Sequence, residues 1–265
     1  MHIIVCIKQV PDPEAPSSSF VINEVLNRVE PRGVPPVLSL FDENALEAAI
    51  RIKQSSAEEV KISILSIGRR VSNAVMQKAL ACCADELVKV EDERFASCSH
   101  DTFSMSSALA MAVRKMGDYD LILTGRQSAD WNHGQTGIGV AALLGIPAIT
   151  LARKVEIISN AVLVERVLSD GHELVKAPLP ALVMVSNEIG SLRYPTMPER
   201  REAARKKVTA LSAEDIGFVH ARKAIELKKL ETPQPRSAQC RIIEEESPAA
   251  AAKNLAFQLR ADRII

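Results

Sequence analysis

Short apolar runs alternate with helical segments between residues 3 and 185, and this alternation restricts the possible folds more than any other feature of the sequence. The apolar runs are Ile3–Val10, Lys61–Ile67, Glu86–Val90, Tyr119–Thr124, Pro147–Leu151 and Pro178–Val185. Helical periodicity covers residues 42–56, 71–84, 101–116 and 137–144. Such alternation is typical of helices packed on both faces of a parallel sheet. We therefore predict an α/β fold with a doubly wound, mostly parallel sheet.

Two regions inside this pattern are expected to differ. Residues 14–40 are irregular and contain several prolines, so we predict no regular element there. A small antiparallel ribbon is predicted over residues 154–158, 162–168 and 174–176, with a turn at Ser169–Gly171.

The C-terminal part of the chain has a different character. Residues 197–208 are strongly charged and predict a helix. Residues 209–246 carry proline, serine and acidic residues with little periodicity, which predicts an extended arm. A final helix is predicted at Ala249–Arg263. We therefore divide the chain into residues 1–208 and a C-terminal arm with its helix, residues 209–265.

The carboxyl ends of the predicted strands indicate where a ligand would bind. Ligands of doubly wound sheets sit beyond these ends, which makes the loops after Val10, Ile67 and Thr124 candidates. The loop after Thr124, Gly125–Gly137 (GRQSADWNHGQTG), is the most informative because it follows a strand and opens a helix. The free N–H groups of such a helix start can bind a phosphate. The alternative is a solvated loop before a capped helix, since the segment matches neither known glycine-rich phosphate motif.

Individual side chains in this loop suggest separate roles. Ribose or base contacts are available from Gln127, Ser128, Asp130 and Asn132, and Thr136 is expected to add a hydroxyl bond and to cap the helix. Trp131, the only tryptophan, can stack on a base, pack against a partner or cover the sheet edge. His133 is more simply interpreted as a surface residue without a functional role than as a catalyst.

Composition and motifs exclude several function classes. The chain has 33 basic and 33 acidic residues, and its aromatic content is 3%, so a general nucleic-acid binder is not expected. Its five cysteines form no zinc pattern and are interpreted as reduced thiols. No signal peptide or bilayer-length apolar run is visible, which favours a cytoplasmic location. Serine-hydrolase and zinc-protease motifs are absent, and we expect Asp42 to cap a helix.

Taken in order, several segments resemble the β subunit of electron-transfer flavoprotein. They are Val5–Asp12 (VCIKQVPD), Phe41–Ile50 (FDENALEAAI), Gly125–Gly137, Leu179–Pro198 (LPALVMVSNEIGSLRYPTMP) and the basic Ala203–Lys207 (AARKK). The resemblance implies an electron carrier without substrate chemistry of its own, in a heterodimer with an α subunit. It implies one FAD shared with that α subunit and a structural AMP bound by the β chain. Flavoprotein dehydrogenases, such as acyl-CoA dehydrogenases, are the implied electron donors.

The resemblance also implies functional residues, position by position. The cofactor-binding set would be Cys6, Ser39, Leu40, Phe41, Asp42, Ile67, Gly125, Arg126, Gln127, Ser128, Ala129, Asp130, Trp131, Asn132, His133, Gly134, Gln135 and Thr136. Within it, Phe41 would approach the flavin of the α subunit. The partner-docking loop would be Tyr194, Pro195, Thr196, Met197 and Pro198, with Met197 as its apolar anchor. The C-terminal arm and helix, residues 209–265, would pack on the α subunit.

Some positions depart from the family pattern. Ser39-Leu40 replaces a common Asn-Pro, Ile67 stands where some members have cysteine, and charged Glu199-Arg200-Arg201 follows the docking loop. Electron-bifurcating members hold a second, redox-active FAD in the AMP position, and their loop reads closer to DGDTAQVGP. The loop here differs, which favours AMP, with the second FAD as the alternative. A stand-alone adenine-nucleotide sensor or transferase is the other alternative, although only Arg126 and Asp130 near the loop would suit it.

Overall fold

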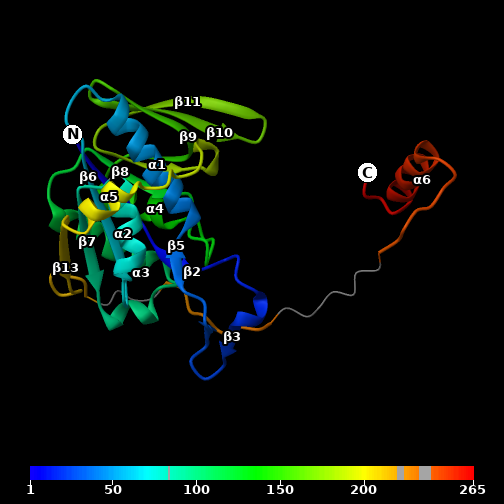
Figure 1. Ribbon diagram of the computed structural model, residues 1–265, viewed down its shortest axis with the longest axis horizontal. Coiled ribbons are helices and arrows are strands. Elements are labelled where there is room, and N and C mark those ends of the chain that lie inside the picture. Colours follow the sequence, from blue (N-terminus) through cyan, green and yellow to red (C-terminus); the bar gives the residue numbers. More distant parts are fainter. Residues whose placement is uncertain (83, 220–223, 233–239) are drawn as a thin grey trace. The chain divides into compact units, whose positions relative to one another are not determined.

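The computed structural model describes residues 1–82, 84–219, 224–232 and 240–265. They form two compact units, Met1–Leu230 and Glu231–Ile265. The first unit is built on a sheet that has nine strands within the described residues, in the order β11-β10-β9-β12-β8-β1-β6-β7-β13 (Figure 1). These strands are β1 (His2–Cys6), β6 (Lys61–Gly68), β7 (Glu86–Glu91), β8 (Leu121–Gly125), β9 (Ala148–Ile158), β10 (Ala161–Leu168), β11 (Gly171–Pro178), β12 (Ala181–Val185) and β13 (Lys207–Leu211).

Strand pairing confirms the predicted doubly wound architecture. From β9 through β13 all neighbours pair in parallel, and only β9–β10 and β10–β11 are antiparallel. Strand β1, inside the sheet, shows why both faces must be covered, because its residues alternate between two cores. Ile3 and Val5 belong to one buried cluster, whereas Ile4 and Cys6 belong to the other. The sequence of β1 therefore reads as continuously apolar, as expected for a strand buried on both faces.

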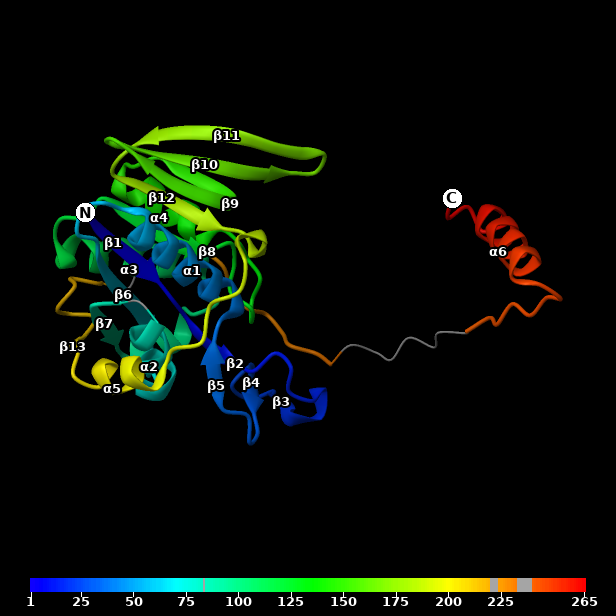
Figure 2. The same ribbon diagram turned by 45° about the horizontal axis from the view of Figure 1, so that its top comes forward.

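Helices form a layer on each face of the sheet (Figure 2). One core contains residues of α1 (Leu40–Ser55), α2 (Asn73–Cys82) and α5 (Met197–Ala203), and the other contains residues of α3 (Thr102–Met116) and α4 (Thr136–Leu144). The helix α6 (Pro248–Ala261) belongs to the second unit. No helix among the described residues is long and apolar enough to cross a membrane.

Several predicted elements have different boundaries in the structure. The first strand was predicted over Ile3–Val10, but β1 ends at Cys6 and the short β2 (Gln9–Pro11) pairs with β5 (Pro36–Leu38) instead. Residues 14–40 also contain the hairpin of β3 (Phe20–Asn23) and β4 (Arg28–Pro31), so the prediction of no regular element there was wrong. The predicted strands at 147–151 and 154–158 form the single strand β9.

The region around residue 208 also differs from expectation. The helix predicted over residues 197–208 ends at Ala203, because Lys207–Leu211 forms strand β13 on the edge of the sheet next to β7. The proposed boundary at residue 208 therefore falls inside a strand, and the contacts of the first compact unit continue to Leu230. Part of the predicted arm, residues 220–223 and 233–239, lies outside the described residues. The final helix, predicted at Ala249–Arg263, is α6.

Candidate functional site

The sheet reverses its winding between β1 and β8, and a cavity lies at that point. The chain passes from β1 to β6 and β7 on one side of β1, and then returns to β8 on the other side. Loops leaving β1 and β8 therefore diverge at their carboxyl ends, which is where doubly wound folds bind ligands. A cavity of about 330 Å³ is lined by residues of both loops. This volume lies at the lower end of the range for small-molecule sites, roughly 300–1,000 Å³.

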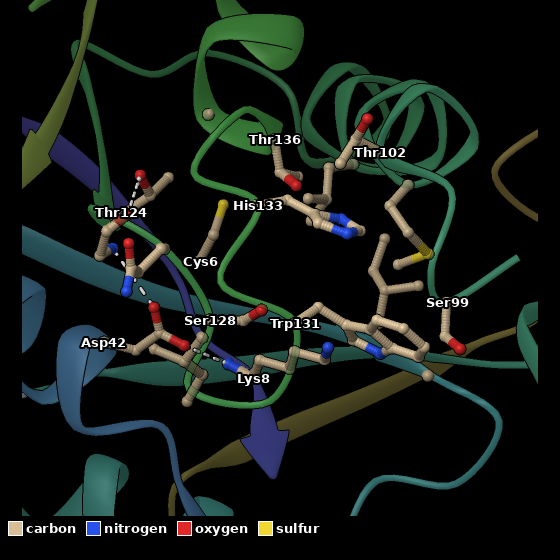
Figure 3. Close-up of a pocket in the computed structure, with 18 of the residues that line it drawn as sticks. Cys6, Lys8, Asp42, Ser99, Thr102, Thr124, Ser128, Trp131, His133 and Thr136 are labelled. Atoms are coloured by element: carbon tan, nitrogen blue, oxygen red, sulfur yellow. Dashed lines mark hydrogen bonds between the residues drawn. The ribbon is translucent and has the colours of Figure 1, made fainter. Parts of the chain in front are cut away.

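Most of the predicted cofactor-binding residues line this cavity (Figure 3). They are Cys6, Asp42, Ile67, Gly125, Arg126, Gln127, Ser128, Trp131, His133, Gly134 and Thr136. Seven predicted residues do not line it: Ser39, Leu40, Phe41, Ala129, Asp130, Asn132 and Gln135. Several of these seven shape the site indirectly, through contacts with residues that do line it.

Asp42 joins the two diverging loops. Its buried carboxylate accepts a hydrogen bond from the backbone N–H of Lys8, after β1, at 2.8 Å, and one from the N–H of Gly125, after β8, at 3.3 Å. Burial raises the pKa of this carboxyl group to about 7, although both hydrogen bonds oppose the shift. The prediction that Asp42 caps its helix was wrong, because α1 begins at Leu40 and Ser39 is the residue before it. Ser39 is held there by the segment after β1, because its N–H donates to the carbonyl of Lys8 at 2.9 Å.

Two glycines allow the loop Gly125–Gly137, called the nucleotide loop here after its predicted role, to approach the rest of the fold. A Cβ atom at Gly125 would lie 2.6 Å from the backbone carbonyl of Phe41, and one at Gly137 would lie 2.9 Å from the Met184 side chain. Only glycine lets α4 start this close to the sheet. The first turn of α4 leaves N–H groups without partners inside the helix, and Thr136 and Gly137 from this turn line the cavity, together with Gly134 just before it. This end of the cavity is suited to an anion.

Thr136 does not cap α4 as predicted. The residue before the helix is Gln135, which makes no side-chain capping bond, and Thr136 is the first helical residue. The hydroxyl of Ser106, on α3, donates to the Thr136 carbonyl at 3.0 Å, which holds the start of α4 against α3. The side chain of Thr136 makes no capping bond and lines the cavity (Figure 3).

Two positively charged side chains near the cavity, Lys8 and Arg126, differ in their partners. Lys8 pairs with Asp130 at 2.6 Å, so each largely neutralises the other. The guanidinium of Arg126 lies 4.9 Å from the centre of the Phe41 ring, and its Nε is buried without a hydrogen-bond partner among the described residues. A buried donor without a partner is uncommon, and the Arg126 side chain also lines the cavity. Burial and the neighbouring Asp42 raise the pKa of the Cys6 thiol to about 12, so this thiol stays protonated.

Sequence reasoning missed one whole wall of the cavity. Residues of η2 (Glu93–Ser97), the following loop and α3 line it: Phe95, Ala96, Ser99, Thr102, Met105 and Leu109. This wall follows the carboxyl end of β7, the strand beyond β6. Other residues missed are Ile7, Lys8, Gln9, Gly68, Arg69, Arg70, Val71, Thr124, Gly137, Val140 and Met184. Of these, Lys8, Gln9 and the segment 68–71 lie in or next to two of the loops that the strand order had already indicated.

The predicted docking loop, Tyr194–Pro198, lies away from the cavity, beside α2. Tyr194 is 81% exposed and Met197 is 63% exposed. The loop is fastened by Glu199, whose carboxylate accepts from Arg193 at 2.6 Å and from the Thr196 N–H at 2.7 Å. These bonds, led by the one from Arg193, lower the pKa of Glu199 to about 2. The two exposed side chains of the loop, Tyr194 and Met197, are therefore carried on a backbone that is held in place.

Comparison with known proteins shows which family the chain belongs to. A family model described as "Electron transfer flavoprotein domain" matches residues 28–216. An electron transfer flavoprotein subunit beta from Megasphaera elsdenii is 31% identical over 277 residues, covering 100% of both chains. This chain belongs to the electron transfer flavoprotein β-subunit family. Another such subunit, from Thermoanaerobacterium thermosaccharolyticum, is 36% identical over 82% of this chain and 80% of its own.

The family match covers most of the residues that line the cavity, although Cys6–Gln9 precede it. The match over residues 28–216 contains α1 with Asp42, the nucleotide loop before α4, and the docking loop. Protein FixA from Azorhizobium caulinodans is 32% identical over 95% of this chain and 92% of its own. The two β subunits and FixA are thus similar to this chain over 82% to 100% of its length. Among the described residues, no group of histidine, cysteine, aspartate or glutamate side chains is placed to hold a metal ion.

Proposed function

We propose that this chain is the β subunit of a cytoplasmic heterodimeric electron transfer flavoprotein and that it binds AMP in the cavity between β1 and β8. The heterodimer would accept electrons from flavoprotein dehydrogenases through an FAD shared with the α subunit. The β chain would contribute the nucleotide site, a wall of the flavin site at Phe41, and the docking loop Tyr194–Pro198. It would carry out no substrate chemistry of its own.

The observation that carries this proposal is that the lining of one cavity combines a helix start with a mostly apolar wall. One end presents the first turn of α4 with Thr136, a site for an anion. The other wall is mostly apolar, with Phe95, Met105 and Leu109, which suits a flat base. A phosphate joined to a base through a ribose matches this division. Arg126 lines the same cavity and brings a positive charge near the ligand.

The size of the cavity favours AMP over a second FAD. At about 330 Å³ it suits a mononucleotide better than a dinucleotide that carries a three-ring system. The loop 130–137 (DWNHGQTG) also differs from the sequence typical of bifurcating members. A nucleotide that binds only the folded chain stabilises it by about 4 kcal/mol at a thousandfold excess over its dissociation constant. AMP would therefore act on stability rather than as a redox group.

Counting the bound cofactors tests the proposal. The chain is co-expressed with the α subunit encoded beside it, the purified complex is denatured, and released FAD and AMP are quantified against protein. One FAD and one AMP per heterodimer are expected. Two FAD and no AMP would replace AMP by the bifurcating alternative. A chain that neither recruits an α subunit nor retains any nucleotide would contradict the proposal as a whole, and nucleotide bound without an α subunit would favour a stand-alone sensor.

A further inference from the structure

Trp131 is the one residue of the nucleotide loop whose role the sequence leaves open. It is the only tryptophan in the chain. A stacking residue, a partner contact and a cover for the sheet edge were all compatible with its position. In the structure its side chain is partly buried and lines the cavity, together with His133 from the same loop (Figure 3).

The loop holds the indole in a defined place. The backbone N–H of Trp131 donates to the Asp130 carboxylate at 3.0 Å, and Asp130 is itself paired with Lys8. The next residue, Asn132, has a φ of 54° and closes a turn by donating its N–H to the Ser128 carbonyl at 3.0 Å. These contacts fix the backbone on both sides of Trp131.

Two imidazole rings support the indole. The ring centre of His133 lies 5.8 Å from that of Trp131, and the ring centre of His100 lies 5.9 Å away, both tilted. Tilted aromatic pairs at this separation are favourable. His133 lines the cavity, whereas His100 does not and so supports Trp131 from outside it. The aromatic group is thus built into the wall rather than free to leave it.

The wall of η2 and α3 that lines the same cavity is mostly apolar, with two hydroxyl groups at Ser99 and Thr102. Phe95, Met105 and Leu109 line the same cavity and offer no strong hydrogen-bonding groups. Thioether and aromatic side chains both pack well against the faces of aromatic rings. An indole contributes one N–H donor and a large π-face, and every nucleobase has a π-face that can stack on it.

We propose that Trp131, supported by His133 and His100, is the residue on which the base of the bound nucleotide stacks. This inference rests on the proposed nucleotide site and adds its selectivity: the cavity selects for the aromatic base as well as for the phosphate. A sugar phosphate without a base would bind only through the α4 end. Purine monophosphates would bind more tightly than pyrimidine monophosphates, because the larger ring covers more of the indole.

The test uses the full-length chain freed of copurified nucleotide, with binding measured by calorimetry. For Trp131→Ala we expect AMP affinity to fall about tenfold, since one base–aromatic stack is lost. Trp131→Phe should stay within about threefold of the wild type. Ribose 5-phosphate, used as a competitor, should bind the wild type and Trp131→Ala equally. Phe257→Ala, which removes an exposed ring on α6, is the matched control and should leave AMP affinity unchanged.

Intrinsic fluorescence gives a second measurement that needs no variant. Because Trp131 is the only tryptophan, stacking of adenine on it should quench the emission of the wild-type chain in step with the calorimetric binding curve. AMP binding with unchanged emission, or with equal affinity in Trp131→Ala, would overturn the stacking inference and leave the nucleotide site standing. Absence of AMP binding to the wild type would instead reject the nucleotide site, and the stacking inference with it.

Discussion

At the scale of single residues, Asp42 makes the site sensitive to pH. Its burial raises its pKa to about 7 in the folded chain, whereas an unfolded aspartate titrates near 4. Between these values the folded state holds a proton that the unfolded state has lost. The contribution of Asp42 to the free energy of unfolding therefore decreases as the pH rises from about 4 to about 7, by at most about 1.4 kcal/mol per pH unit, and is level above this window.

This dependence can be measured as a difference between two variants. Urea unfolding of the nucleotide-free chain is followed across this window for the wild type and for Asp42→Asn. The wild type should lose stability relative to Asp42→Asn as the pH rises, because only the wild type has to bury a charge. Asp170→Asn, in the exposed turn between β10 and β11, should show no such trend. A difference between wild type and Asp42→Asn that does not change with pH would contradict the prediction.

Gly125 sets the distance between the nucleotide loop and α1. In Gly125→Ala the added methyl group would lie 2.6 Å from the Phe41 backbone, which cannot move without shifting the start of α1. We expect a destabilisation of about 1–3 kcal/mol in urea unfolding. Gly68→Ala is the matched control, because its methyl group would meet its nearest neighbours at 3.7 Å. Its stability should change by less than about 1 kcal/mol, and equal losses in both variants would show that close approach is not the cause.

At the scale of elements, the sequence predicted what periodicity and apolar content determine locally. The strand Lys61–Gly68 and the helix Thr102–Met116 agree with prediction to within one residue, because each buries a regular apolar pattern. The β3–β4 hairpin was missed because its support comes from far along the chain. The Asn27 side chain donates to the Leu227 carbonyl at 2.9 Å and accepts from the Leu230 N–H at 3.0 Å. No local pattern reports such a contact.

The same reasoning explains the site. The nucleotide loop could be recognised because strand, glycine, polar residues and helix follow one another within one segment. The wall of Phe95, Met105 and Leu109 could not, because it depends on where α3 packs after β7. Asp42 was expected to serve its own helix, yet its carboxylate bridges two loops that are adjacent only in the folded sheet. The role of a residue such as Asp42 thus depends on partners that are distant in sequence, which local patterns do not reveal.

The docking loop is the element on which partner recognition can be tested. Met197 stands exposed on a backbone fixed by Glu199, so truncating it should remove contact area without loosening the loop. We expect Met197→Ala to slow reduction of the heterodimer by an acyl-CoA dehydrogenase about fivefold or more, as for an interface anchor. Flavin content should be unchanged.

A matched variant separates docking from general loss of apolar surface. Leu174→Ala removes a side chain that is 70% exposed on β11, in a different part of the sheet. Its reduction rate should equal that of the wild type. If Met197→Ala also transfers electrons at the wild-type rate, the loop is not the docking site for that dehydrogenase.

At the scale of the whole molecule, the division into two compact units suggests where the α subunit binds. The described residues of the unit Glu231–Ile265 form no core: α6 contains no buried residue, and Leu255 and Phe257 are 47% and 75% exposed. An isolated helix of this length is marginal in water. It is therefore expected to gain its stability by packing these apolar side chains on the α subunit, whereas Met1–Leu230 has both cores of the sheet.

A chain that ends at Leu230 separates these roles. It should fold, and AMP should still stabilise it against unfolding, because every residue that lines the cavity lies between Cys6 and Met184. It should fail to copurify with a co-expressed α subunit. In the full-length chain, replacing Leu255 and Phe257 together by alanine should weaken copurification without affecting AMP binding, because only the apolar face is changed. A one-to-one complex formed by the shortened chain would place the main contact surface on the first unit instead, and α6 would then need another explanation for its exposed side chains.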